Sequence, residues 1–179
     1  VFALILGLSR QVESYARAVR EGRWNDSPFF CLLDYPISDL QGQSLGIIGY
    51  GTLGRAVARL GEAFGMNILI GARPGSTAAA DGRTDLDTLY RESDVISLHC
   101  PLTPETGRLI GPAELAAMKS SALLINTARG GIADELALFQ ALQAGDIGGA
   151  GIDVLDVEPP DGSSPLQAAE LPNLIVTPH

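Results

Sequence analysis

The sequence predicts a doubly wound α/β domain, in which helices cover both faces of a parallel sheet. From residue 44 onward, apolar runs of four to six residues alternate with stretches of helical pattern. The runs lack an alternation of polar and apolar residues, which is typical of strands buried on both faces. The connections between runs leave room for crossover helices, which are right-handed between parallel strands.

Six apolar runs are the predicted strands. They span residues 45–49, 67–71, 94–98, 122–126, 149–154 and 173–176. Helices are predicted between them, near residues 52–64, 86–92, 112–118 and 133–143, and Gly145 follows the last of these. The longest irregular segment, residues 155–172, is rich in Pro, Asp, Gly and Ser. Loops of this length in a compact domain are usually functional or mobile.

The chain divides into three predicted parts. Residues 1–22 predict one leading helix whose first turns are apolar nearly all round, so we expect it to be buried at an interface. Residues 23–43 predict an irregular connection, and residues 44–179 predict the nucleotide-binding core. The chain has no initiator methionine and stops directly after a strand, so we expect it to be truncated at both ends.

Composition excludes several function classes. Apolar residues make up 46% and charged residues 18% of the chain, which is ordinary for a folded domain. A net charge of −9 argues against a nucleic-acid-binding or membrane-binding surface. No secretory signal is present, which favours the cytoplasm. Cys31 and Cys100 provide neither a disulfide framework nor metal-ligand spacing, so no metal is expected.

A glycine-rich turn gives the first indication of a ligand. Gly49, Gly51 and Gly54 form G-x-G-x-x-G directly after a predicted strand and at the start of a predicted helix. In this motif the first glycine permits the tight turn, the second admits a pyrophosphate, and the third lets helix and strand pack closely. Thr52 and Leu53 open the helix, whose N–H groups and dipole favour a diphosphate. A purely structural glycine turn is the alternative.

The second strand indicates which dinucleotide is bound. An acid that binds the ribose 2′-hydroxyl is expected about 20 residues after the motif. Ala72 stands at that position and Arg73 follows it. A guanidinium can hold a 2′-phosphate, with Ser76 and Thr77 as further donors. We therefore predict that NADP(H) is preferred. If Arg73 is only a solvated turn residue, NAD(H) is the cofactor instead.

Four stretches then carry a family resemblance. They are "SDVISLHCPLTPETGRLIG", "LINTARGGIADE", "GAGIDVLDVEPP" and "NLIVTPH", in this order. Their order resembles the motifs of the D-isomer-specific 2-hydroxyacid dehydrogenases, and "FCLLDYPISDLQGQSLGIIGYG" looks most like the glycerate dehydrogenase and hydroxypyruvate reductase branch. The resemblance implies an oxidoreductase that moves a hydride between NAD(P)H and a small 2-oxo acid. It also implies a homodimer, and a second, substrate-side domain that this chain lacks, so that the chain alone is inactive.

The resemblance also implies roles for single residues. Arg129 corresponds to the arginine that holds the substrate carboxylate and 2-oxo oxygen. His179 corresponds to the proton donor, and Glu158 to the acid that pairs with it. Histidine ordinarily titrates near neutrality, and a carboxylate beside it favours the protonated ring. The matching cofactor-side positions are Cys100, Pro101 and Thr106 near the ribose and phosphates, and Thr127, Ala128 and Asp153 near the nicotinamide.

Each of these residues also has a plain structural reading. Arg129 could face solvent at a helix start, Glu158 could be a loop acid, Asp153 could end a strand, and His179 could be a terminal residue without a role. His99 also follows a strand, and we interpret it as a cofactor-side or packing residue rather than a base. Two other functions remain open: a non-catalytic dinucleotide sensor related to corepressors, and an NAD-binding domain of the adenosylhomocysteinase type.

Overall fold

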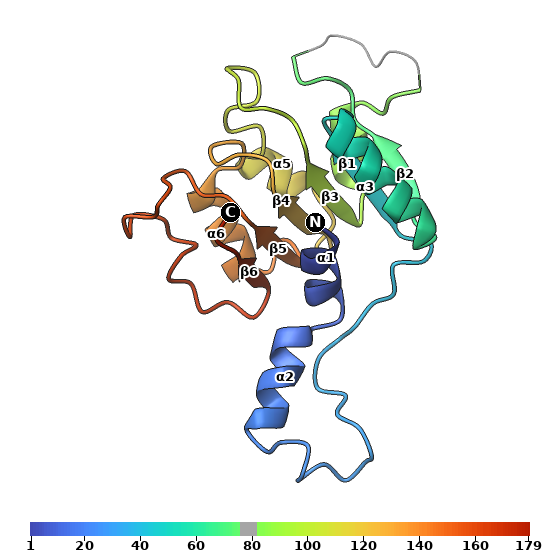
Figure 1. Cartoon of the computed structure of the whole chain (residues 1–179), viewed down its shortest axis with the longest axis vertical. Coiled ribbons are helices and arrows are strands. Elements are labelled where there is room, and N and C mark those ends of the chain that lie inside the picture. Colours follow the sequence, from blue (N-terminus) through green and yellow to red (C-terminus); the bar gives the residue numbers. More distant parts are fainter. Residues whose placement is uncertain (76–81) are drawn as a thin grey trace.

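The computed structural model describes residues 1–75 and 82–179, and its centre is a six-stranded sheet (Figure 1). The strands are β1 (Ser44–Ile48), β2 (Asn67–Ile70), β3 (Val95–Leu98), β4 (Leu123–Asn126), β5 (Gly149–Ile152) and β6 (Leu174–Val176). Their order in the sheet is β2-β1-β3-β4-β5-β6, and every neighbouring pair is parallel. The predicted parallel α/β fold is therefore confirmed.

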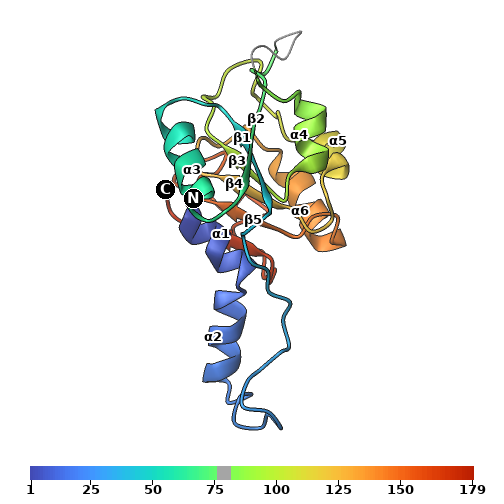
Figure 2. The same cartoon turned by 90° about the vertical axis from the view of Figure 1, so that its right-hand side faces the viewer.

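Helices cover both faces of this sheet (Figure 2). The helices of the described residues are α1 (Phe2–Ser9), α2 (Val12–Arg20), α3 (Thr52–Ala63), α4 (Leu86–Glu92), α5 (Pro112–Ala117) and α6 (Glu135–Ala144). Helices α1 and α3 lie on one face, and α4, α5 and α6 lie on the other. The chain winds outward from β1 in both directions, so the doubly wound topology is confirmed as well.

Two hydrophobic cores, one on each face, explain why the strands are apolar without alternation. Leu89 of α4 and Leu138 of α6 are fully buried in one core, and Ile5 of α1 is fully buried in the other. Successive residues of β4 contribute to different cores, since Leu124 belongs to the first and Ile125 to the second. A strand with this environment needs large apolar residues on both faces.

The leading segment departs from the single helix that its periodicity predicts. The helix breaks between α1 and α2, where Gln11 has a φ of 51°, in the left-handed region. At the break, Ser38 N–H donates to the Ser9 carbonyl at 2.9 Å, and Arg10 pairs with Asp39 at 2.6 Å. These partners are distant in the sequence, which is why local periodicity does not reveal the break. Helix α1 packs on β4, β5 and β6, whereas α2 points away from the sheet (Figure 1).

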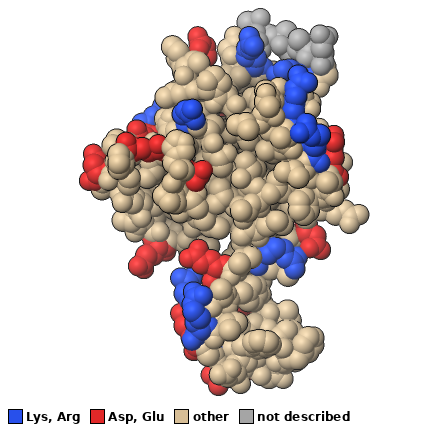
Figure 3. All heavy atoms as spheres, in the orientation of Figure 1, with Lys and Arg blue, Asp and Glu red and all other residues tan. Residues whose placement is uncertain are grey.

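Residues 10–39, here called the N-terminal arm, project from the domain. The arm is closed on itself by an Arg23–Asp34 ion pair at 2.5 Å and by a hydrogen bond from the Tyr15 hydroxyl to the Tyr35 carbonyl at 2.8 Å. Its large apolar side chains are exposed: Val12, Val19, Trp24, Phe29, Phe30, Leu33 and Ile37. The end of the arm is almost free of charged side chains on the face shown in Figure 3. In the described ranges no helix has the length and apolar character needed to cross a bilayer.

The topology determines where a ligand can bind. All six strands are parallel, so their carboxyl ends share one edge of the sheet. The winding direction changes between β1 and β3, and open α/β sheets bind ligands at the carboxyl edge beside such a change. The glycine turn after β1 and residues 99–101 after β3 meet at this place.

Candidate active site

The three motif glycines have different surroundings, which separate their roles. Gly49 has a φ of +100°, and a Cβ there would lie 2.5 Å from the Cys100 nitrogen. A Cβ on Gly54 would lie 2.2 Å from the Gly49 carbonyl oxygen. A Cβ on Gly51 would meet nothing within 4 Å. Gly49 and Gly54 thus permit close backbone packing, whereas Gly51 leaves space open at the cavity that it lines.

A cavity of about 750 Å³ opens beside the glycine turn at the ends of β1, β2 and β3. Its walls include six residues of the predicted cofactor site: Gly49, Gly51, Arg73, Cys100, Pro101 and Thr106. Thr52 and Leu53 begin α3, which has no side-chain cap and no acid in its first turn. Such a helix start leaves N–H groups for an anion. The structure therefore gathers the predicted adenosine and diphosphate residues in one place.

Arg83 is a second arginine in the same cavity, and sequence reasoning missed it. Thr84 forms an isolated bridge with Gly71 at the end of β2, which brings Arg83 back beside Arg73. Arg83 Nη1 donates to the Gly71 carbonyl at 3.1 Å. No local sequence pattern predicts that Arg83 lies at the same cavity as Arg73. The predicted donors Ser76 and Thr77 lie outside the described residues, and Glu105 is an acid among the described residues of the cavity wall.

The segment after β3 is fixed by short polar contacts. Thr106 is buried, and its Oγ1 donates to the Pro101 carbonyl at 2.6 Å and accepts from the Thr103 N–H at 2.7 Å. His99 Nε2 bonds Ser97 Oγ at 2.9 Å, and burial lowers the pKa of His99 to about 4. Burial also raises the pKa of the Cys100 thiol. Both side chains are therefore neutral at pH 7, which suits packing against a cofactor better than acid–base work.

The loop after β4 is shaped by Asn126, which sequence reasoning did not single out although it begins the "NTARGG" motif. Its buried side chain donates from Nδ2 to the Arg129 carbonyl at 2.9 Å and accepts at Oδ1 from the Ala128 N–H at 3.1 Å. Thr127 lies between them on the same turn. Arg129 is exposed, and its Nη1 donates to the Ala128 carbonyl at 2.6 Å. The turn thus presents a guanidinium at the sheet edge.

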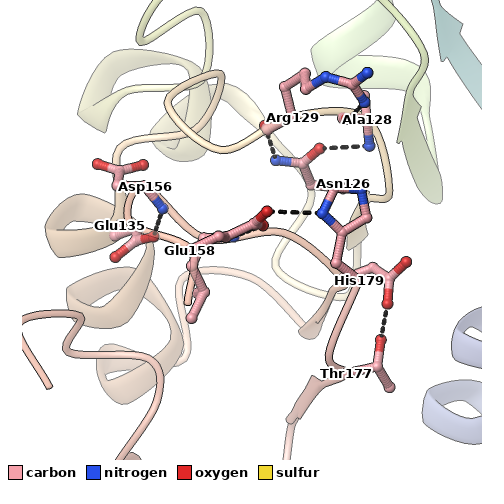
Figure 4. A network of polar contacts seen from close by, with 10 residues as sticks. Asn126, Ala128, Arg129, Glu135, Asp156, Glu158, Thr177 and His179 are labelled. Atoms are coloured by element: carbon pink, nitrogen blue, oxygen red, sulfur yellow. Dashed lines mark hydrogen bonds and ion pairs between the residues drawn. The ribbon is translucent and has the colours of Figure 1, made fainter. Parts of the chain in front are cut away.

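Glu158 and His179 meet across the ends of β5 and β6. His179 Nδ1 and Glu158 Oε2 are 2.7 Å apart, and Glu158 Oε1 accepts from the Leu155 N–H at 2.9 Å. In Figure 4 the imidazole and the carboxylate face each other, with Arg129 on the neighbouring loop. The hydrogen bond with His179 is the largest cause that lowers the pKa of Glu158, followed by that with Leu155. A carboxylate bonded to one ring nitrogen fixes the orientation of the imidazole and leaves the other nitrogen for a substrate.

Backbone contacts fix the segment that carries His179. The His179 N–H donates to the Asp153 carbonyl at 3.0 Å, and Thr177 N–H donates to the Ile152 carbonyl at 2.9 Å. The Thr177 hydroxyl donates to the Asp153 carboxylate. A second cavity, of about 620 Å³, is lined by Asp153, Glu158 and His179 together with Pro159, Pro160 and Gln167. Asp153 therefore lies beside the predicted acid–base pair.

The structure brings the predicted catalytic residues to one edge but joins only two of them directly. Arg129 is the last of the causes that lower the pKa of Glu158, and no ion pair between them is found among the described residues. No cluster of metal-binding side chains is found in residues 1–75 and 82–179. The edge therefore has a cavity lined by the glycine turn and two arginines at one end, and the hydrogen-bonded Glu158 and His179 at the other.

Comparison with known proteins agrees with this arrangement. The family model described as "D-isomer specific 2-hydroxyacid dehydrogenase, NAD binding domain" matches residues 2–179. A glycerate dehydrogenase of Methylorubrum extorquens is 53% identical over all of this chain and 56% of its own length. A glyoxylate/hydroxypyruvate reductase B of Klebsiella pneumoniae is 44% identical over all of this chain and 55% of its own.

A solved structure shows the same similarity in three dimensions. An acyclic imino acid reductase in complex with NADPH and D-Arg is 30% identical, with a TM-score of 0.84 over 99% of this chain and 55% of that one. The chain therefore belongs to the D-isomer-specific 2-hydroxyacid dehydrogenase family and corresponds to its NAD-binding domain. It spans about half the length of the curated relatives that it matches.

Proposed function

We propose that this member of the 2-hydroxyacid dehydrogenase family is the cofactor-binding half of an NADP(H)-dependent reductase of small 2-oxo acids, such as hydroxypyruvate or glyoxylate. The observation that carries the proposal is the 2.7 Å pair between His179 and Glu158, which shares its sheet edge with the glycine-turn cavity. The substrate class is supported by the glycerate dehydrogenase and the glyoxylate/hydroxypyruvate reductase among its relatives.

The residues of the cavity fit a dinucleotide. The open space at Gly51 admits a diphosphate against the backbone, and the uncapped start of α3 favours its negative charge. Arg73 and Arg83 are assigned to the 2′-phosphate, because both line the cavity. The buried Ala72 occupies the position where an acid would otherwise bind the 2′-hydroxyl. We therefore infer that NADP(H) is preferred over NAD(H).

The acid–base pair accounts for the proton in the reaction. The bound cofactor supplies the hydride that reduces C2 of the 2-oxo acid. His179 donates a proton from Nε2 to the carbonyl oxygen, since its Nδ1 is bonded to Glu158. Glu158 holds the ring in this orientation through the 2.7 Å contact of its Oε2 with Nδ1. Arg129 binds the substrate carboxylate through two hydrogen bonds and stabilises the negative charge that develops on the carbonyl oxygen.

Dimerisation belongs to the same proposal. The N-terminal arm exposes seven large apolar side chains, and Phe30 is 91% exposed. Exposed apolar patches of this kind mark interaction surfaces. We assign the arm to contact with a second copy of the protein, which extends the interface predicted for residues 1–22. A monomeric mass in light scattering across micromolar concentrations would contradict this assignment.

The test of function is a panel of 2-oxo acids with NADPH and NADH on the complete protein. We expect reduction of hydroxypyruvate or glyoxylate, with a higher kcat/KM for NADPH than for NADH. The 179-residue chain alone should bind NADPH but turn over little. If the complete protein binds NADPH and reduces none of the acids, the sensor hypothesis replaces the enzyme. A strong preference for NADH would remove the role given to Arg73 and Arg83.

A further inference from the structure

We propose that Arg108 is a positioning residue, which holds the three loops of the catalytic edge in a fixed relation. It lies between β3 and α5 and joins the loop after β4, which carries Arg129, to the loop after β5, which carries Glu158. This inference rests on the proposed function, because it explains how those two side chains are aligned for one substrate.

The backbone of Arg108 makes the first connection. Its N–H donates to the Gly131 carbonyl at 2.7 Å, so the segment after β3 is tied to the loop that carries Arg129. Arg108 has a φ of 54°, in the left-handed region, which is unfavourable for a non-glycine residue. Such conformations persist where the surrounding contacts fix them, and they gather at functional sites.

The guanidinium makes the second connection. Arg108 Nη2 lies 3.0 Å from Asp156 Oδ2, and Nη1 lies 3.6 Å from Asp134 Oδ1. The other oxygen of Asp156 accepts from the Gly131 N–H at 2.7 Å. Arg108, Gly131 and Asp156 therefore form a closed ring of contacts across three loops. Asp134 also caps α6, since its Oδ1 accepts from the Ala137 N–H at 3.0 Å.

The ring lies next to the catalytic residues in the chain. Gly131 is two positions after Arg129, and Asp156 is two positions before Glu158. A Cβ on Gly130 would lie 1.9 Å from the Leu155 carbonyl oxygen, so the two loops are also packed backbone to backbone. The Asp156 N–H donates to Oε1 of the buried Glu135 at 2.7 Å, which anchors the ring to α6 (Figure 4).

Exposure of the ion pairs distinguishes positioning from simple stabilisation. The Arg108 side chain is 53% exposed and that of Asp156 is 27% exposed. Ion pairs in such surroundings add little to the free energy of unfolding. A small displacement of aligned groups, in contrast, can lower a rate by as much as about 10²-fold. Loss of Arg108 should therefore lower kcat far more than it lowers Tm.

The test is Arg108→Asn in the complete protein, since asparagine tolerates the left-handed region and removes the guanidinium. We expect kcat for 2-oxo acid reduction to fall about tenfold or more, with the Kd for NADPH unchanged within about twofold. Arg108→Lys should recover part of the loss. Arg108→Gly is the second variant if Arg108→Asn folds poorly.

Lys119→Gln is the matched control. It removes the Lys119–Asp94 ion pair, 2.7 Å long with side chains 38% and 26% exposed, at the opposite edge of the sheet. Equal losses in this control and in Arg108→Asn would overturn the proposal, as would an unchanged kcat in Arg108→Asn.

A second readout is independent of catalysis. Amide exchange at Gly131 and Asp156 should accelerate in Arg108→Asn and not in Lys119→Gln, and unchanged exchange would overturn the proposal. A wild-type protein that binds NADPH but reduces no 2-oxo acid would instead overturn the proposed function, while the exchange experiment would still test the connection between the loops.

Discussion

The two halves of the sheet edge are built in different ways. Beside β1, β2 and β3, a cavity opens next to the glycine turn, and the Gly49 turn packs directly on the Cys100 backbone. Beside β4, β5 and β6, side chains from separate loops form the site, as in the pair of Glu158 and His179, 21 residues apart. We infer that substitutions in the first half act on packing and affinity, whereas those in the second act on rate.

The largest expected effect is on the rate in the catalytic half. His179→Ala in the complete protein should lower kcat about 10²–10⁴-fold, because it removes the proposed proton donor. Tm should change little, since the His179 side chain is 54% exposed. Steady-state kinetics with hydroxypyruvate and a thermal melt measure both.

Glu158→Gln should give a smaller loss of kcat, with Glu170→Gln, an exposed acid of the same long loop, as its control. A near-normal kcat for His179→Ala would remove the proton-donor assignment.

The next prediction distinguishes the glycine that is needed for stability from the glycine that is needed for cofactor binding. Gly54→Ala should lower the free energy of unfolding by about 1–3 kcal/mol, because its Cβ would lie 2.2 Å from the Gly49 carbonyl oxygen. Gly51→Ala is its matched control, since a Cβ there meets nothing within 4 Å. It should leave stability unchanged and weaken NADPH binding. Urea unfolding and NADPH fluorescence titration measure the two quantities. Equal stability of both variants would contradict the separation.

A smaller effect concerns the choice of cofactor. Arg83→Ala should lower kcat/KM for NADPH about tenfold, which is about 1.4 kcal/mol, and leave that for NADH unchanged. Arg59→Ala, at an exposed position of α3 outside the cavity, is the control and should change neither value. If Arg83→Ala lowers kcat/KM equally for NADPH and NADH, Arg83 supports the cavity wall and does not bind the 2′-phosphate.

The smallest effect is a pH dependence of stability that differs between the halves. The pKa of His99 is lowered to about 4 from 6.5, so the unfolded chain takes up a proton first as the pH falls. The favourable contribution of neutral His99 to the free energy of unfolding is therefore complete above pH 6.5. It is lost as the pH falls from 6.5 to about 4. The pKa of Glu158 lies below its ordinary value of 4.5. Its contribution to the free energy of unfolding is therefore complete above pH 4.5 and is lost only at more acid pH.

Urea unfolding at pH 7 and pH 5 measures the effect of His99 on the free energy of unfolding. His99→Gln should reduce the difference in this free energy between the two pH values. NMR titration of the imidazole measures the pKa itself. A His99 that titrates near 6.5 would show that burial does not affect it.

The sequence by itself determined the fold and the local part of the site. Every predicted strand and every helix after residue 44 is present, with ends shifted by no more than about two residues. This accuracy has a physical basis, because strands buried on both faces must be apolar and the turns between them need glycine or polar residues. The motifs also selected Arg129, Glu158 and His179, whose roles remain predictions.

Only the tertiary structure decided the features that depend on distant partners. The break at Gln11 is accompanied by contacts from Ser38 and Asp39, and the return of Arg83 to the cavity follows the bridge between Gly71 and Thr84. The ring of Arg108, Gly131 and Asp156 likewise joins three loops. The local sequence pattern indicates which residues of one helix or strand are buried. These contacts, in contrast, form only when the sheet brings the ends of separate strands to a common edge.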